Sequence, residues 1–232
     1  MNHDHPTLLA VAHGTRDPAG AATVRALLDR TRALRPWIGV AEAYAEIAEP
    51  SLEAAMSRIG GPVVAVPLML ARGYHALVDI PGRAGPDALT ARPLGPHPMI
   101  AAALAGRLAE ALDGHRLGRH DTVVLGAAGS SDPNGAADVR TAARLLSRRL
   151  RRPVPYGFVA AEGPQLSQVV ADHSHGRVIV ASYLLAPGLF HTRMVTSGAD
   201  VVSAPIGAHD AMARLILRRF DETRVRDGLR VA

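Results

Sequence analysis

Two stretches of the chain repeat one another and decide the fold. Residues 9–20 read LAVAHGTRDPAG and residues 124–135 read VLGAAGSSDPNG, so that position 13 corresponds to position 128, an offset of 115 residues. Each stretch begins with a short apolar run, which is typical of a buried parallel strand. Each then reaches Asp-Pro, the pattern of a helix N-cap followed by proline at the first helical position. The pair predicts a strand–loop–helix unit that occurs twice.

Two further segments repeat in the same order at nearly the same offset. Residues 67–75, PLMLARGYH, return as residues 182–191, SYLLAPGLFH, with one inserted residue, and residues 93–98, PLGPHP, return as residues 205–210, PIGAHD. Repeats in matching order indicate an internal duplication. We therefore expect two similar domains, 1–114 and 119–232, joined in the polar stretch 113–120.

Apolar and amphipathic segments alternate along the first half. The expected strands are Thr7–Ala12, Ile38–Ala45, Pro62–Met69 and Ala88–Arg92, and the expected helices are Ala19–Leu34, Pro50–Ile59 and Met99–Leu112. Such alternation predicts an α/β fold in which each domain is a parallel sheet flanked by helices. Ligands of these folds bind beyond the carboxyl ends of the strands, and two facing domains would enclose a cleft.

Composition excludes several classes of protein. The chain has no Cys, which removes disulfides, Cys zinc sites and iron–sulfur clusters. It has no Lys, so that all 26 basic residues are Arg, and neither a P-loop nor Schiff-base chemistry is expected. We accordingly expect no ATP, NAD or iron–sulfur cofactor. A net charge of +5 fits a polyanionic small substrate.

Partners and compartment follow from the same composition. The arginines are dispersed and aromatic residues make up 3% of the chain, which disfavours nucleic-acid binding. No apolar run approaches the roughly 20 residues that a membrane-spanning helix needs. The first six residues carry no basic-then-apolar signal region. We expect a soluble cytoplasmic protein without a membrane partner.

Three candidate ligands follow three expected strands. His13 ends the first, Glu46 the second, and His75 follows the third through a short turn. Two imidazoles and a carboxylate form a site suited to Fe, Co, Ni or Zn that leaves coordination positions open for a substrate. Asp79, four residues after His75, can accept from the second ring nitrogen of His75 if the segment is helical. The alternatives are capping or packing roles for the histidines and a solvated Asp79.

The motifs around these residues resemble the class II tetrapyrrole chelatases, specifically the sirohydrochlorin chelatases. The resemblance rests on His13-Gly-Thr-Arg, on Glu46 shortly before Pro-Ser-Leu, and on Gly-Tyr-His75 followed by Asp79-Ile-Pro. It covers nearly the whole chain, including the duplicated layout of the two-domain members. The resemblance implies insertion of a divalent metal into sirohydrochlorin, with His13, Glu46 and His75 as metal-binding and catalytic residues.

The resemblance also implies how the substrate is held. Sirohydrochlorin is a polycarboxylate, which Arg16 and Arg72 can dock and which Thr15 can help to cradle at the helix start. Arg16 in a structural salt bridge is the alternative. Fe²⁺, giving sirohaem, is favoured over Co²⁺ for cobalamin, and Ni²⁺ or Zn²⁺ fit the same ligands. No ATP is expected to be needed. The alternative function is a non-catalytic tetrapyrrole or metal carrier.

The second half departs from the family pattern. Ala128 stands where His13 does, Ala160 aligns near Glu46, and only His191 remains. We therefore expect one metal site, in the N-terminal domain, with the degenerate C-terminal domain as the opposite wall of the cleft. His191 either contacts the macrocycle as a substrate-binding residue or packs as a relic. A duplicated chain can enclose its own cleft, which favours a monomer.

Overall fold

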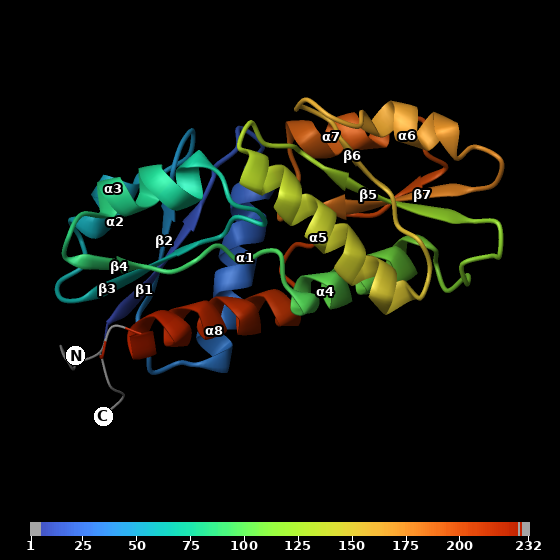
Figure 1. Ribbon diagram of the computed structural model, residues 1–232. Helices are drawn as coiled ribbons and strands as arrows, with labels where there is room; N and C mark the ends of the chain where they lie inside the picture. Colours follow the sequence, from blue (N-terminus) through green and yellow to red (C-terminus); the bar gives the residue numbers. More distant parts are fainter. Residues whose placement is uncertain (1–5, 227, 229–232) are drawn as a thin grey trace. The chain divides into compact units, whose positions relative to one another are not determined.

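The computed structural model describes residues 6–226 and 228 of the chain (Figure 1). The first four strands are β1 (Thr7–Ala12), β2 (Val40–Tyr44), β3 (Val63–Pro67) and β4 (Ala88–Thr90). The other four are β5 (Thr122–Ala127), β6 (Tyr156–Phe158), β7 (Val178–Tyr183) and β8 (Val201–Val202). The α-helices are α1 (Pro18–Leu34), α2 (Leu52–Met56), α3 (Ile80–Ala84), α4 (Pro98–Ala111), α5 (Pro133–Leu150), α6 (Leu166–Asp172), α7 (Leu189–Val195) and α8 (Asp210–Arg226). One π-helical turn, η1 (His75–Asp79), precedes α3.

The strands form two parallel sheets of the same topology, and the expected α/β class is confirmed. Their orders are β2-β1-β3-β4 and β6-β5-β7-β8. In each sheet the chain moves outward from the first strand to the second and then crosses back to the third. The direction therefore reverses between β1 and β3, and between β5 and β7. Such a reversal opens a crevice at the carboxyl ends of the strands, where open α/β sheets bind ligands.

The long helices begin where the Asp-Pro pairs predict. The Asp17 side chain accepts from the backbone N–H of Ala19 at 2.9 Å, and Asp132 accepts from that of Asn134 at 2.8 Å. Each carboxylate satisfies a donor that would otherwise lack a partner at a helix start. β1 has the predicted bounds, and β2, β3 and β4 lie inside the predicted ranges. Among residues 6–226 and 228, no helix is both long and apolar enough to cross a membrane.

Each sheet is covered on both faces. In the first sheet, Leu9, Val11 and Ala65 pack with residues of α2 and α3, including Leu52 and Ile80. Helices α1 and α8 contact one another, and α8 contacts β3 and β4. In the second sheet, residues of β5 and β7 pack with α6 and α7, while α4 contacts α5 and β7.

The two compact units of the structure do not coincide with the two sequence repeats, because each unit contains one helix from the other repeat. Within the described residues, the first unit comprises 6–94 together with 208–226 and 228, and the second comprises 95–207. The expected boundaries, 1–114 and 119–232, follow the sequence repeat and assign α4 to the first domain and α8 to the second. Packing assigns them the other way, because α8 covers the first sheet and α4 the second. The chain changes unit within the repeated segments 93–98 and 205–210.

Two arginines, the buried Arg219 and the partly exposed Arg107, hold the segments where these exchanges occur. Arg219 on α8 donates to the carbonyl oxygens of Pro93 and Leu94, both at 2.9 Å, and its side chain is 3% exposed. Arg107 on α4 donates to the carbonyl oxygen of Ile206 at 2.9 Å. Because 107 and 219 are equivalent positions of the repeat, the duplication preserved this clamp in both units.

Candidate metal site

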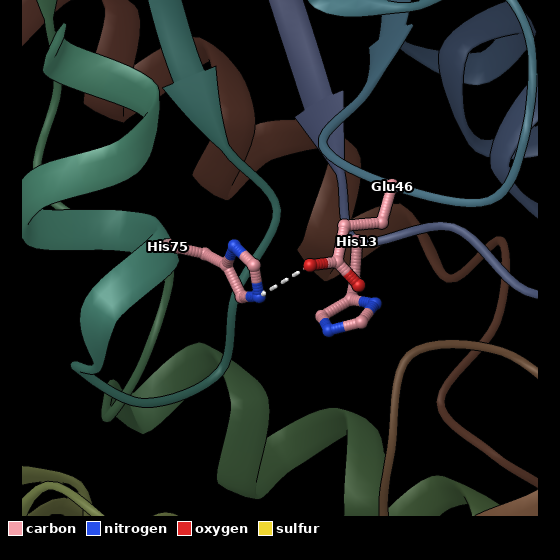
Figure 2. Close-up of side chains that lie close together, drawn as sticks. All are labelled: His13, Glu46 and His75. Atoms are coloured by element: carbon pink, nitrogen blue, oxygen red, sulfur yellow. Dashed lines mark ion pairs between the residues drawn. The ribbon is translucent and has the colours of Figure 1, made fainter. Parts of the chain in front are cut away.

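Three side chains meet at the carboxyl ends of the first sheet. His13 follows β1, Glu46 follows β2, and His75 opens η1 after β3. Each offers a ligand atom, and these atoms all lie within 4.8 Å of one another. Figure 2 shows the two imidazoles and the carboxylate turned toward a common point, with His75 Nε2 3.6 Å from Glu46 Oε1. The structure thus brings together the three residues predicted as metal ligands, at the reversal between β1 and β3.

Backbone hydrogen bonds place His13 beside Glu46. The pairing of β1 with β2 continues beyond both strands, because Ala45 N–H donates to Ala12 O at 2.8 Å and Glu46 N–H donates to His13 O at 2.9 Å. Gly14 has φ +99°, and a Cβ there would lie 1.9 Å from Glu46 O. Only glycine fits this approach of the two loops. The His-Gly motif therefore has a steric reason as well as a chemical one.

A strained residue turns the chain directly after Glu46. Ile47 has φ +67°, a region that β-branched residues rarely adopt, and Ala48 N–H donates back to Glu46 O at 2.6 Å. Left-handed backbone costs an L-residue roughly 1–2 kcal/mol. Strain of this kind is concentrated at functional sites, where the surrounding structure maintains it. The Ile47 side chain is 59% exposed.

The ligand side chains are accessible to solvent, and exposed apolar residues neighbour two of them in the sequence. The Glu46 side chain is 51% exposed and that of His75 25%. Tyr74, Leu77 and Val78 on the adjoining turn, like Ile47, are exposed large apolar residues. The Tyr74 and His75 rings meet edge to face with centroids 5.8 Å apart. The arrangement offers an accessible metal-ligating centre with exposed apolar residues next to His75 and Glu46 in the sequence.

The second nitrogen of His75 has a carboxylate partner. His75 Nδ1 lies 3.0 Å from Asp79 Oδ2 across η1, as the four-residue spacing predicts. A carboxylate on the far nitrogen fixes the orientation of a metal-ligating imidazole. Sequence reasoning missed Arg83, which donates to the same Asp79 oxygen at 3.2 Å and forms a two-point ion pair with Glu53. Its spacing of four from Asp79 was the available signal.

Electrostatics favour the ionised form of Glu53. Hydrogen bonds from Arg83 lower the pKa of Glu53 from its ordinary value to about 2. Hydrogen bonding to Glu53 correspondingly raises the pKa of Arg83. The pair remains charged over the physiological range, which keeps the guanidinium in place beside Asp79.

The predicted substrate residues lie in three places. Thr15, Arg16 and Arg72 are in the loops that follow β1 and β3, and both arginine residues are exposed. The Thr15 hydroxyl accepts from Asp17 N–H at 3.1 Å, which orders the loop before α1. His191 lies on α7 of the second unit, with Nε2 3.2 Å from Ser203 O.

The second unit keeps the backbone of the site without its ligands. Ala160 N–H donates to Ala128 O at 3.0 Å, the same bond as Glu46 N–H to His13 O. Gly129 has φ +105°, and a Cβ there would lie 2.2 Å from Ala161 Cβ. Ala128 and Ala160 therefore occupy the same backbone positions in the second unit as His13 and Glu46 occupy in the first.

Comparisons with known proteins identify relatives of the whole chain. The sequence model of the CbiX family matches the chain twice, at residues 7–111 and 122–223. A sirohydrochlorin ferrochelatase of Priestia megaterium is 26% identical over 234 residues, covering 90% of this chain and 87% of that protein. A sirohydrochlorin cobaltochelatase of Methanosarcina acetivorans is 30% identical over an alignment of 124 positions, which covers 45% of this chain and 95% of that one.

Solved structures share the fold across both units. SirB from Bacillus subtilis with Fe³⁺ has a TM-score of 0.81 at 24% identity, covering 96% of this chain and 97% of that one. The chelatase SirB from Bacillus subtilis subspecies spizizenii in complex with cobalt has a TM-score of 0.75 at 25% identity, with the same coverage. Since the family model matches most of the sequence in two successive copies, the chain is a two-repeat member of the CbiX family.

Proposed function

We propose that this protein is a sirohydrochlorin chelatase, which inserts a divalent metal ion into the macrocycle without ATP. The observation that carries the proposal is the open cluster of His13, Glu46 and His75, whose ligand atoms lie within 4.8 Å of one another. Full-length similarity to a ferrochelatase supports Fe²⁺ as the preferred metal, with Co²⁺ as the alternative. The absence of Lys, and so of a P-loop, supports ATP independence.

The ligand set suits an ion that must be released again. Two imidazoles and one carboxylate capture a borderline metal and leave coordination positions free for the ring nitrogens. A closed four-ligand site would retain the ion. Exposure of Glu46 and His13 leaves the ion accessible to the macrocycle, and the apolar residues beside them support a flat ring close to the metal.

Metallation also removes two pyrrole N–H protons. A neutral imidazole accepts a proton at physiological pH once it has released the metal. His75 lies between two carboxylates, with Glu46 on the Nε2 side and Asp79 on the Nδ1 side. We assign His75 as the first proton acceptor, the exposed Glu46 as the relay to solvent and His13 as a metal ligand.

Carboxylates on the rim of the substrate need cationic partners. Arg16 and Arg72, exposed in the loops that follow β1 and β3, form charge-assisted hydrogen bonds with these groups in our proposal. Thr15 contributes through the ordered start of α1. His191 is proposed as a further contact to the macrocycle, and the metal is assigned to the first unit alone.

The test is anaerobic absorbance spectroscopy of sirohydrochlorin with Fe²⁺ or Co²⁺ and catalytic amounts of protein, without nucleotide. We expect multiple turnovers that His13→Ala abolishes. His175→Ala, an exposed histidine remote in sequence from the cluster, is the control and should retain full activity. A spectral change that saturates at one equivalent of protein, with no faster metallation, would identify a carrier instead.

A further inference from the structure

Arg83 links the surroundings of two proposed metal ligands. It lies on α3, and its side chain is 28% exposed. Its Nε and one terminal nitrogen hold Glu53 on α2 at 2.6 and 2.9 Å. The other terminal nitrogen, Nη1, donates to Ala45 O at 2.7 Å and to Asp79 Oδ2 at 3.2 Å. One guanidinium thus joins α2, the end of β2 and η1.

Each acceptor of Nη1 is directly connected to one of the proposed metal ligands, through the backbone or through a side-chain contact. Ala45 immediately precedes Glu46, and its own N–H is held by Ala12 O at 2.8 Å. Asp79 is the carboxylate that contacts His75 Nδ1 at 3.0 Å. A shift of the Arg83 guanidinium would therefore change the backbone from which Glu46 projects and also the partner of His75.

The geometry needs a guanidinium. The two-point pair with Glu53 fixes the plane of the group, which leaves Nη1 directed at its other two acceptors. A Lys ammonium is a single point charge, and it cannot hold Glu53 in this fork while also reaching both acceptors. Asp79, when it accepts from Arg83, presents its oxygen as an acceptor to His75 Nδ1–H, which leaves the Nε2 lone pair directed toward the metal.

We propose that Arg83 is a positioning residue, which sets the separation and orientation of His75 and Glu46 for metal binding through Asp79 and the carbonyl of Ala45. The inference rests on the proposed function, because it takes the cluster as a metal site. It extends that function by assigning geometric control to a residue outside the cluster of His13, Glu46 and His75.

The experiment is a Co²⁺ titration of the purified protein without tetrapyrrole, followed by the visible d–d bands of the bound ion. Arg83→Met should raise the Co²⁺ Kd about 10- to 100-fold, the usual effect of losing a partner behind a metal ligand. It should also shift the d–d spectrum, because the ligand geometry changes. Arg83→Lys should recover less than half of the lost affinity on a logarithmic scale. Arg58→Met, an exposed arginine of the same unit, is the matched control and should stay within about twofold of wild type.

Arg83→Met that folds, by circular dichroism, and keeps the wild-type Kd and d–d spectrum would overturn the proposal, even if its Tm falls. If Arg83→Met does not fold, Glu53→Gln decides. It weakens the fork but leaves Nη1 and both its acceptors in place, and we expect a roughly threefold to tenfold rise in Kd with a spectral shift. An unchanged Glu53→Gln would then overturn the proposal. A wild-type protein that binds no Co²⁺ would overturn both this inference and the proposed function, whereas normal wild-type binding with unaffected variants removes the Arg83 assignment alone.

Discussion

Replacing Arg219 with Met tests how helix α8 is attached to the first unit. Arg219 is almost fully buried and donates to the carbonyl oxygens of Pro93 and Leu94, the last residues before the chain leaves this unit. Met is similar in length and helix propensity but provides no donor. Both carbonyl groups would lose a charged partner in a buried setting.

The magnitude follows from these contacts. A buried acceptor without a partner costs about 1–3 kcal/mol, so two of them cost roughly 2–6 kcal/mol. Burial lowers the pKa of Arg219, which means that removing the guanidinium recovers part of its desolvation cost. Glu222 keeps Arg92 and Arg218 as partners and is not left unpaired. We expect a net loss of about 2–4 kcal/mol, or a fall in Tm of roughly 5–15 °C for a chain of this size.

The assay is guanidinium and thermal unfolding followed by circular dichroism, because Trp37 is 72% exposed and reports weakly on burial. Arg214→Met, an exposed arginine on the same helix, controls for the loss of charge. If Arg219→Met unfolds within about 0.5 kcal/mol of Arg214→Met, the clamp contributes nothing and the reasoning fails.

Glu222, Gly14 and Asp79 each make contacts whose removal has a measurable effect. Burial alone would raise the pKa of Glu222, but hydrogen bonds from its three arginine partners outweigh it and lower the pKa to about 2. Because the folded pKa lies below the unfolded value, Glu222 contributes stability above about pH 4.5 that is lost as the pH falls toward 2. In the Glu222→Gln variant, the free energy of unfolding should depend less on pH between about 4.5 and 2 than it does in the wild type. Equal pH dependence in the two proteins would contradict this. Gly14 has φ +99°, and a Cβ there would lie 1.9 Å from Glu46 O. Gly14→Ala should therefore lower the free energy of unfolding by at least about 2 kcal/mol and weaken Co²⁺ binding. Wild-type values in denaturation and in the Co²⁺ titration would disprove the steric argument. Asp79→Asn should raise the Co²⁺ Kd about tenfold or more in the same titration, and no change would show that His75 is oriented without it.

Local patterns predicted the parts of this fold that depend on local physics. The apolar run before His13 predicted the bounds of β1, and Asp17-Pro18 predicted the start of α1. The positions of His13, Glu46 and His75 at strand ends predicted their proximity, because parallel strands end at the same edge of a sheet. The spacing of Asp79 from His75 predicted their contact.

Features that depend on tertiary packing could not be predicted from the sequence. An amphipathic helix shows which of its faces is apolar but not which sheet that face covers, so the exchange of α4 and α8 between units could not be read from periodicity. Arg83 is one of 26 arginines, and its acceptors on α2, β2 and η1 are set by tertiary packing. The left-handed Ile47 opposes its own backbone preference and reflects the demands of the loop around Glu46.

The most direct test of the account is anomalous X-ray scattering at the cobalt edge from crystals of the Co²⁺-loaded protein. We predict one strong peak in each chain, bound by His13, Glu46 and His75 at the roughly 2.0–2.2 Å typical of such ligands. The equivalent position between Ala128, Ala160 and His191 should show none. A peak at other residues, with the cluster of His13, Glu46 and His75 empty, would contradict the assignment of the site and of the chemistry proposed for it.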